Sequence, residues 1–243
     1  MNAPASPELR GVWAAMPMPL NDDGTLDRGA LNELVARYAA AGVDGAYCTG
    51  TDGEFHTLEL DEFRTLAEAF AAAADRVNLP IQAGTGWLTL RGAIERTRIA
   101  RDLGIRWVQV VPPFWMPLND IERVRFYSQL AEAVPDVGIV LYNTDRIGRI
   151  LGAEQIRELA EAVPSIVGSK YDGVDRTEFA EICAATPELA HLPVDLGIGP
   201  SAEYPTKGCA AGWPTSILSG RWSGGEQSSA ATGWSRTGGT GSR

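Results

Sequence analysis

The sequence predicts an α/β domain folded as a (β/α)8 TIM barrel. Three observations support this fold class: short apolar segments recur along the chain, amphipathic helical segments separate them, and the chain is 243 residues long. The apolar segments are near-continuous runs rather than alternating ones, which is typical of parallel strands covered on both faces. Repeated strand–helix units in this length favour a closed barrel. An open, doubly wound sheet is the alternative, because periodicity alone does not show whether the sheet edges meet.

The strands are predicted from short runs of mostly apolar residues. In chain order we expect them at residues 12–16, 45–49, 80–83, 107–111, 138–142, 166–170, 193–197 and 210–215. No glycine-rich phosphate-binding fingerprint follows the first run, because AAMPMP continues into LNDDG. The sequence therefore argues against a nucleotide-binding version of the α/β fold.

Three of the intervening segments carry clear signals for the start or the end of a helix. They cover residues 27–42, 60–75 and 89–104. Residues with short polar side chains precede each segment, and we expect them to act as N-caps: Thr25 or Asp27, Thr57, and Thr89. Gly42 and Gly104 are the expected ends of the first and the third helix.

The composition changes after residue 218. Residues 219–243 hold seven Gly, six Ser and three Thr and show no apolar period. Such a segment cannot bury enough surface to offset the entropy of ordering it. We therefore expect a barrel domain over residues 1–218, without an eighth helix or a helical extension, and a disordered or non-native tail over 219–243. A shifted reading frame or a lost native end near Ile217 is the interpretation we favour.

The charge balance narrows the classes of partner. Asp and Glu number 31 against 21 Lys and Arg, a formal net charge of -10. This argues against nucleic acid and anionic membrane as partners, since both are negatively charged. The N-terminus MNAPASPELRG has no apolar stretch that fits a signal peptide, and no run is long enough to cross a bilayer. We expect a cytoplasmic protein.

Cysteine and histidine give no sign of a disulfide framework or a metal site. The three cysteines are widely spaced and odd in number, so we expect buried free thiols. Two isolated histidines, His56 and His191, form no metal-ligand cluster, and we interpret both as surface or internally satisfied residues. We therefore expect no metal.

Lys170 is the first candidate catalytic residue. The chain has only two lysines, Lys170 and Lys207, and all its other residues with a permanently basic side chain are arginines. Lys170 ends a predicted buried strand, and the active sites of (β/α)8 barrels lie at these carboxyl ends. Burial disfavours the ammonium form and frees the amine to attack a ketone or aldehyde, giving a Schiff base. A lone lysine at a strand end is more often a surface residue, so its neighbours must support the assignment.

Other strand ends supply a proton carrier and binding groups. Tyr142 ends the preceding strand, and its phenol is suited to move protons during imine formation and bond cleavage. The turn of residues 50–53 offers backbone N–H groups for a substrate carboxylate. The last two strand ends add further residues expected to contact the substrate, Gly197 and Pro214.

Several motifs together resemble the dihydrodipicolinate synthase / N-acetylneuraminate lyase superfamily. They are GVWAAMPMPLNDDGTLD, GVDGAYCTGTDGEFHTLELDE, YNTDRIGR, IVGSKYDG and GCAAGWPTS, spread over residues 11–216. The resemblance implies that Lys170 forms an imine with a 2-oxo acid, usually pyruvate, without a further cofactor. It also implies that Tyr142 and the Thr51 hydroxyl relay protons and that the loop at Gly50, Thr51 and Asp52 cradles the substrate carboxylate. A homo-oligomer, commonly a tetramer, otherwise a dimer, is implied likewise.

Three positions depart from the pattern of the family's synthases. Phe114 stands where a second relay tyrosine is expected, and Ile147 stands where an arginine grips the second substrate, with Arg146 and Arg149 on either side of it. Asp52 replaces a hydroxyl residue in the carboxylate cradle. Two such carboxylates about 4 Å apart repel by about 4 kcal/mol at an effective dielectric constant of about 20. We expect Phe114, Arg146 and Arg149 to face the substrate.

The sequence therefore predicts a Schiff-base lyase or aldolase for a pyruvate-type 2-oxo acid, and not a dihydrodipicolinate synthase. A dehydratase or a hydratase-aldolase would use the same Lys170 imine and is the alternative within this chemistry. A catalytically silent barrel is the alternative from another class, favoured by Phe114, Asp52 and the aberrant tail. A phosphate-binding barrel isomerase ranks below these, because no glycine-rich loop follows the seventh strand.

Overall fold

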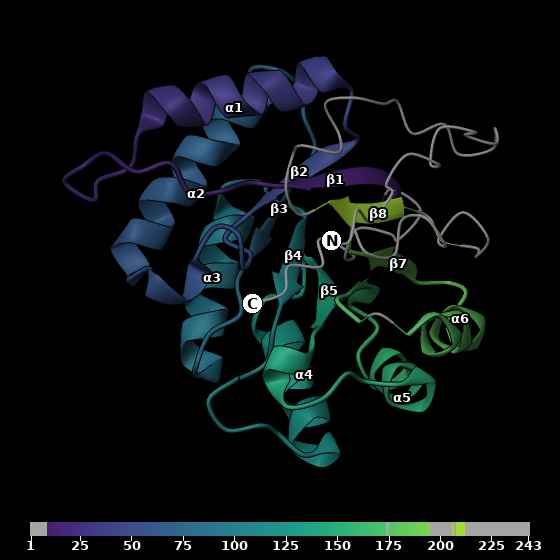
Figure 1. The fold of residues 1–243 in the computed structure, drawn as a ribbon. Coiled ribbons are helices and arrows are strands. Elements are labelled where there is room, and N and C mark those ends of the chain that lie inside the picture. The colour runs from purple at the N-terminus through teal and green to yellow at the C-terminus, as the bar shows by residue number, and fades with distance from the viewer. Residues whose placement is uncertain (1–8, 174, 195–205, 207, 212–243) are drawn as a thin grey trace, which may run out of the picture.

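A computed structural model describes residues 9–173, 175–194, 206 and 208–211. Within them the chain forms eight strands that belong to one sheet and pair in parallel (Figure 1). The strands are β1 (Gly11–Ala15), β2 (Gly45–Cys48), β3 (Ile81–Gly84), β4 (Trp107–Val110), β5 (Gly138–Asn143), β6 (Ile166–Tyr171), β7 (Ala190–Pro193) and β8 (Gly208–Ala211). The predicted tail, Gly197, Lys207 and Pro214 lie outside the described residues.

The sheet closes on itself. Its hydrogen-bonded order is β7-β6-β5-β4-β3-β2-β1-β8, so β1 pairs with both β2 and β8. A parallel bridge between Val194 and Ala210 joins the two ends of this order. The (β/α)8 barrel is therefore confirmed over the open sheet, and the carboxyl ends of all strands face the same end of the barrel.

Helices cover the outside of the strands (Figure 1). The α-helices are α1 (Arg28–Ala41), α2 (Leu60–Asp75), α3 (Leu90–Asp102), α4 (Asp120–Ala133), α5 (Ala153–Ala162) and α6 (Arg176–Ala185). Two short 3-10 turns, η2 (Phe55–Thr57) and η3 (Asp145–Ile147), lie in the loops after β2 and β5. None of the described helices combines the length and the apolar character of a membrane span.

The predicted helix ends are largely confirmed, with one correction. Asp27 and Thr89 accept hydrogen bonds from the first-turn N–H groups of Ala30 and Gly92. Gly42 ends α1 in the left-handed conformation that favours glycine. The cap expected at Thr57 was wrong, because Thr57 belongs to η2 and α2 begins after Glu59, whose backbone N–H donates to the Glu62 side chain at 2.8 Å.

The seventh strand lies earlier in the chain than predicted. It spans Ala190–Pro193 rather than residues 193–197, and Leu192 and Ala190 are buried inside the barrel. His191, expected to be a surface or an internally satisfied residue, is the latter: it is buried and its Nδ1 lies 2.9 Å from the Ser169 hydroxyl. The histidine packs between strand and helix because its second ring nitrogen also has a partner, at 3.0 Å in Thr186.

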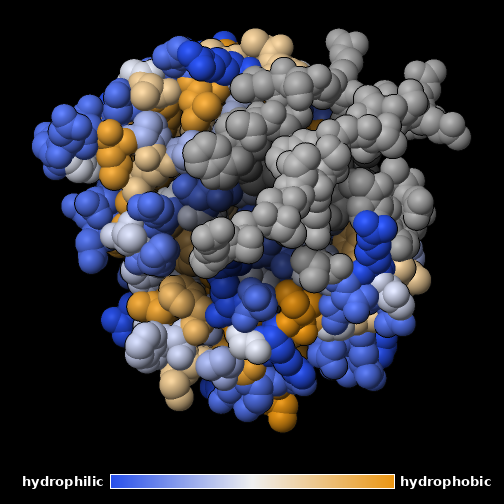
Figure 2. Space-filling model, in the orientation of Figure 1, coloured by the Kyte–Doolittle hydropathy of each residue, from blue (hydrophilic) through white to orange (hydrophobic). Residues whose placement is uncertain are grey.

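Two apolar cores hold the barrel together. The larger one fills the space between strands and helices, and the smaller one fills the barrel itself. Trp13 and Trp107 pack edge to face inside the barrel, with ring centroids 5.9 Å apart. Both lie toward the amino-terminal part of the barrel, so this end is closed by packing and the carboxyl end is left for a site. Figure 2 shows a surface of mostly hydrophilic side chains with small apolar groups between them.

Candidate active site

Lys170 points into the barrel and is almost completely buried. Its neighbour in β6, Ser169, faces the opposite side and bonds to His191, as alternation along a strand requires. Lys170 is 3% exposed, so it is not the surface residue that a strand-end lysine usually is. Its Nζ lies 4.2 Å from the ring centroid of Tyr142 and 4.5 Å from that of Tyr47. Ring faces thus surround the amine, where they compensate part of its desolvation.

Tyr142 lies directly beside Lys170. The two are register partners in the β5–β6 pair, so strand pairing fixes their separation. The Tyr142 hydroxyl is 3.0 Å from the hydroxyl of Thr51, which comes from the loop after β2. Burial raises the pKa of Tyr142 to about 12, and the bond to Thr51 opposes this shift. At neutral pH Tyr142 is therefore a protonated phenol, ready to donate.

Asp172 joins this arrangement and was not predicted from the sequence. It follows Lys170 by two residues, and its carboxylate accepts hydrogen bonds from Tyr142 at 3.5 Å and from Thr144 at 3.1 Å. Arg146 forms a close ion pair with the same carboxylate. The negative charge of Asp172 contributes to the raised pKa of Tyr142. The SKYD order of the sequence was the available signal, because it places a carboxylate just beyond the lysine.

The loop after β2 is held in a conformation that glycine usually adopts. Thr49 has a φ of 52° and Glu54 a φ of 47°, both in the left-handed region. The Thr49 hydroxyl donates to the carbonyl of Gly84 at 2.9 Å and secures the bend. A Cβ on Gly84 would lie 2.0 Å from the Thr49 carbonyl oxygen, so the neighbouring strand requires glycine there. Strained backbone of this kind gathers at functional sites, and here it positions Gly50, Thr51 and Asp52.

Asn143 holds the loop after β5. Its side chain donates to the Leu151 carbonyl at 2.8 Å and accepts from the Leu151 N–H at 2.7 Å. These two bonds pin residues 144–150, which carry Thr144 and Arg146, against the end of the strand. The asparagine of the YN motif is thus a structural residue that positions the loop beside Tyr142.

The two arginines expected at the substrate are both paired with carboxylates. Arg146 is bound to Asp172, and Arg149 is bound to Asp120 at the start of α4. Ile147 between them is buried against Val111 and Tyr142. Arg146 therefore lies beside the relay tyrosine, whereas Arg149 ties the loop after β5 to α4. Substrate binding by either arginine stays a prediction.

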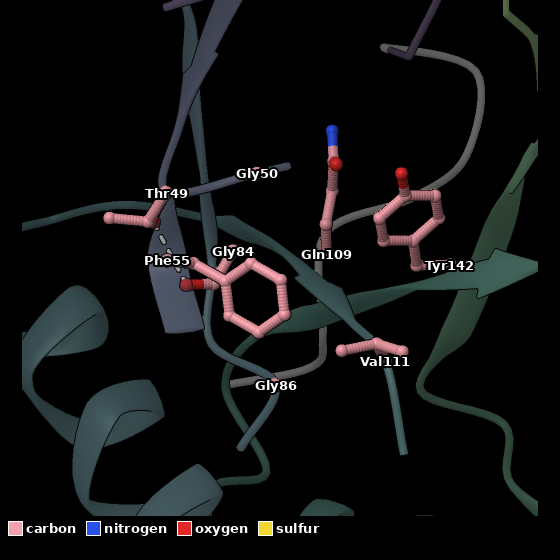
Figure 3. A pocket seen from close by; sticks show the side chains of 8 residues that line it. All are labelled: Thr49, Gly50, Phe55, Gly84, Gly86, Gln109, Val111 and Tyr142. Atoms are coloured by element: carbon pink, nitrogen blue, oxygen red, sulfur yellow. Dashed lines mark hydrogen bonds between the residues drawn. The ribbon is translucent and has the colours of Figure 1, made fainter. Parts of the chain in front are cut away.

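The mouth beside Tyr142 is apolar. Phe114 packs edge to face on Phe55, with ring centroids 5.7 Å apart, and both lie against the cluster that contains Tyr142. Trp115 and Met116, which follow Phe114 on the loop after β4, are exposed. Figure 3 shows the hollow that results. Its lining consists of Thr49, Gly50, Phe55, Gly84, Gly86, Gln109, Val111 and Tyr142.

The arrangement is that of a closed barrel with a buried lysine, a tyrosine beside it and a strained turn after β2. A family model, the dihydrodipicolinate synthetase family, matches residues 8–191. The chain belongs to this family.

Individual relatives within the family differ in activity. A trans-O-hydroxybenzylidenepyruvate hydratase-aldolase of Sphingobium xenophagum is 31% identical over 78% of this chain and 59% of its own. A 4-hydroxy-tetrahydrodipicolinate synthase of Thermus thermophilus is 32% identical over 69% of this chain and 56% of its own. The chain thus spans less than two thirds of either relative.

A solved structure shares the fold. The dihydrodipicolinic acid synthase family protein YagE of E. coli K12, solved in complex with pyruvate, superposes with a TM-score of 0.79 at 24% identity. The match covers 84% of this chain and 70% of YagE. At this identity the likeness concerns the barrel alone.

Proposed function

We propose that this protein is a Schiff-base lyase or aldolase that acts on a pyruvate-type 2-oxo acid through an imine on Lys170. The observation that carries this proposal is the pairing of Lys170 with Tyr142 across β5 and β6, with the amine buried against aromatic rings. A buried amine with an adjacent proton carrier is the arrangement that imine chemistry needs. In this chemistry the C2 carbonyl of the substrate is the electrophile, and no cofactor takes part.

The reaction begins when the neutral amine of Lys170 attacks the C2 carbonyl of the 2-oxo acid. The carbinolamine loses its hydroxyl as water, taking a proton from Tyr142, and the imine forms. Thr51 stabilises the phenolate, because its hydroxyl donates to Tyr142 and lowers the pKa of that residue. The phenolate then removes the proton of the C4 hydroxyl, the C3–C4 bond breaks, and an aldehyde and an enamine result. Protonation at C3 and hydrolysis release pyruvate and the free lysine.

The substrate we propose has a neutral tail. Phe114 and Phe55 form an apolar wall beside Tyr142, and Ile147 provides no positive charge for a second carboxylate. Arg146 and Arg149, the flanking cations, are bound to Asp172 and Asp120. Apolar walls with few polar groups select less charged ligands. An aromatic or a hydroxylated aldehyde fits this description better than aspartate semialdehyde.

A hydratase-aldolase is the second candidate. The 31% identical Sphingobium xenophagum relative carries that name, and the apolar mouth suits an aromatic aldehyde. The two candidates share the Lys170 imine and the cleavage of the C3–C4 bond, and a hydratase-aldolase first adds water to a carbon–carbon double bond of the substrate. We propose for either one a cytoplasmic protein that associates with copies of itself.

The proposal is tested by offering the protein two reactions in parallel. We expect pyruvate release from neutral-tailed 4-hydroxy-2-oxo acids, and negligible ring-product absorbance when pyruvate and aspartate semialdehyde are mixed with the protein. Efficient formation of dihydrodipicolinate would show that Phe114 and Ile147 do not exclude the synthase reaction. Pyruvate release without any ring product would support the proposal.

A further inference from the structure

Two glutamines lie inside the barrel, and the proposed function has no role for them. Gln82 on β3 and Gln109 on β4 are both buried, at 0% and 2% exposure. The Gln109 Nε2 donates to the Gln82 Oε1 at 3.0 Å. Among the described residues the Gln109 Oε1 and the Gln82 Nε2 have no partner. Because buried polar atoms are usually hydrogen-bonded, these two atoms are available to bond a ligand or a buried water.

Gln109 belongs to the wall of the hollow beside Tyr142. Figure 3 shows its side chain extending along the same side of the hollow as the Tyr142 ring. Gly84 and Gly86 contribute only backbone to the neighbouring wall, which is closely packed: a Cβ on Gly86 would lie 2.4 Å from the Val111 side chain. Register places Gln109 opposite Val140, two residues before Tyr142 in β5, so the Gln109 backbone lies deeper in the barrel than that of Tyr142.

The other polar side chains of the hollow are already engaged. The Thr49 hydroxyl donates to Gly84, and the Tyr142 hydroxyl pairs with Thr51. Phe55 and Val111 are apolar. The Gln109 oxygen is therefore the acceptor that this lining offers to a ligand, and a neutral amide oxygen accepts from a hydroxyl and disfavours a carboxylate.

We propose that Gln109 determines specificity by accepting a hydrogen bond from a hydroxyl group on the neutral tail of the substrate, with Gln82 holding the amide in place. This inference rests on the proposed function, because it assumes that the hollow receives the aldehyde portion of a Lys170-bound 2-oxo acid. It narrows that portion to a hydroxyaldehyde. A site that bonds a substrate hydroxyl discriminates against the analogue without it, since the buried amide is then left unpaired.

The test uses glycolaldehyde and propanal as acceptors for pyruvate, because they are similar in size and differ by a hydroxyl in place of a methyl group. We expect wild-type protein to favour glycolaldehyde in kcat/KM. Gln109→Met should lower the ratio of glycolaldehyde to propanal about tenfold, which corresponds to about 1.4 kcal/mol. The ratio of the two kcat/KM values is the readout, because Gln109 lines the hollow and its substitution acts on both aldehydes. Gln155→Met, the same substitution on α5 outside the site, should leave the ratio as it is in the wild type.

Trapping of pyruvate with borohydride separates this inference from the proposed function. Borohydride should reduce the pyruvate imine on Lys170 in both variants to the same extent as in the wild type. If none of the three proteins forms this adduct, the proposed function is wrong, and not only the role of Gln109. Three results would overturn the role of Gln109 if pyruvate is still trapped: the wild type uses both aldehydes equally, it uses neither, or Gln109→Met keeps the wild-type ratio. In each case a buried water, rather than the substrate, would be the partner of the two amides. If Gln109→Met does not fold, the double variant Gln82→Met/Gln109→Met, which strands no amide, must show the same tenfold loss.

Discussion

At the scale of single residues, the chemistry depends on how Tyr142 is held. Its ring lies 4.2 Å from the Lys170 amine, and its hydroxyl lies between Thr51 at 3.0 Å and Asp172 at 3.5 Å. Thr51 lowers the pKa of Tyr142, whereas the charge on Asp172 raises it. The proton carrier is thus balanced between a hydroxyl that favours the phenolate and a carboxylate that opposes it.

Replacing Tyr142 by phenylalanine removes one oxygen and leaves the ring. We expect turnover to fall about 10²–10⁴-fold, because positioned general acid–base groups contribute factors of this size. Imine formation should slow as well, since loss of water from the carbinolamine needs the same proton. Steady-state pyruvate release and the rate of borohydride trapping measure both steps, with circular dichroism as the control for folding. Unchanged turnover would require a different proton carrier.

Asp172→Asn should lower the pKa of Tyr142 below its value of about 12. A nearby negative charge disfavours the phenolate and therefore raises the pKa, so removing the charge has the opposite sign. Ultraviolet titration of phenolate, taken as the difference between each protein and its Tyr142→Phe counterpart, isolates this one tyrosine. A pKa that stays the same or rises would show that Asp172 does not act on the relay. Arg146 loses its ion-pair partner in the same variant, and this also favours the phenolate.

At the scale of elements, loops are fastened to strand ends by specific side chains. Asn143 clamps the loop after β5, and Thr49 secures the bend after β2. The first contact joins two ends of one loop, and the second joins the loop after β2 to the end of β3. The sequence predicted the carboxyl ends of β5 and β6 and placed Tyr142 and Lys170 there. It could not predict that Asp172 reaches Tyr142 or that Gln109 meets Gln82, because these contacts are set by strand register.

The seventh strand shows another reason for a missed element. The strand contains a buried histidine, His191, whose partners are Ser169 on β6 and Thr186 after α6. The sequence does not show these partners, and the strand was expected at residues 193–197 instead. The sequence likewise did not show that Arg149 forms an ion pair with Asp120, because Asp120 lies on α4. Local patterns identify strands and helices, whereas long-range polar partners decide which side chains are free for a ligand.

Asn143→Ala should destabilise the barrel and loosen the loop after β5. Two buried backbone groups of Leu151 lose their partner, and stranded groups of this kind cost about 1–3 kcal/mol. Urea denaturation measures the change in the free energy of unfolding. Asn21→Ala, which removes an exposed hydrogen bond to Thr25, is the matched control and should change stability by less than about 0.5 kcal/mol. Equal effects of both substitutions would contradict the clamp.

At the scale of the whole molecule, the closed barrel brings the residues of the site together from distant parts of the chain. Thr51, Tyr142 and Lys170 come from β2, β5 and β6 or the loops after them. Beside this site the loop after β4 and the start of α4 carry large apolar side chains, with Trp115 82% and Ile121 83% exposed. Exposed apolar side chains gathered in this way are typical of association surfaces.

We expect the protein to associate with copies of itself through Trp115 and Ile121. The double variant Trp115→Ser/Ile121→Ser should shift the protein toward the monomer in sedimentation velocity experiments, because water then replaces an apolar contact. Leu20→Ser, which changes an exposed apolar residue on the loop after β1, should have no such effect. A wild-type monomer, or equal association in all variants, would refute this surface.

The central claim is that the Lys170 amine forms an imine with a 2-oxo acid. Incubation with pyruvate and borohydride, followed by intact mass and peptide mapping, tests it directly, because reduction makes the imine permanent and the chain has only one other lysine, Lys207. The account predicts a single adduct on the peptide that contains Lys170, and its loss in Lys170→Arg. A label on Lys207 alone, or no adduct with any 2-oxo acid, would contradict it.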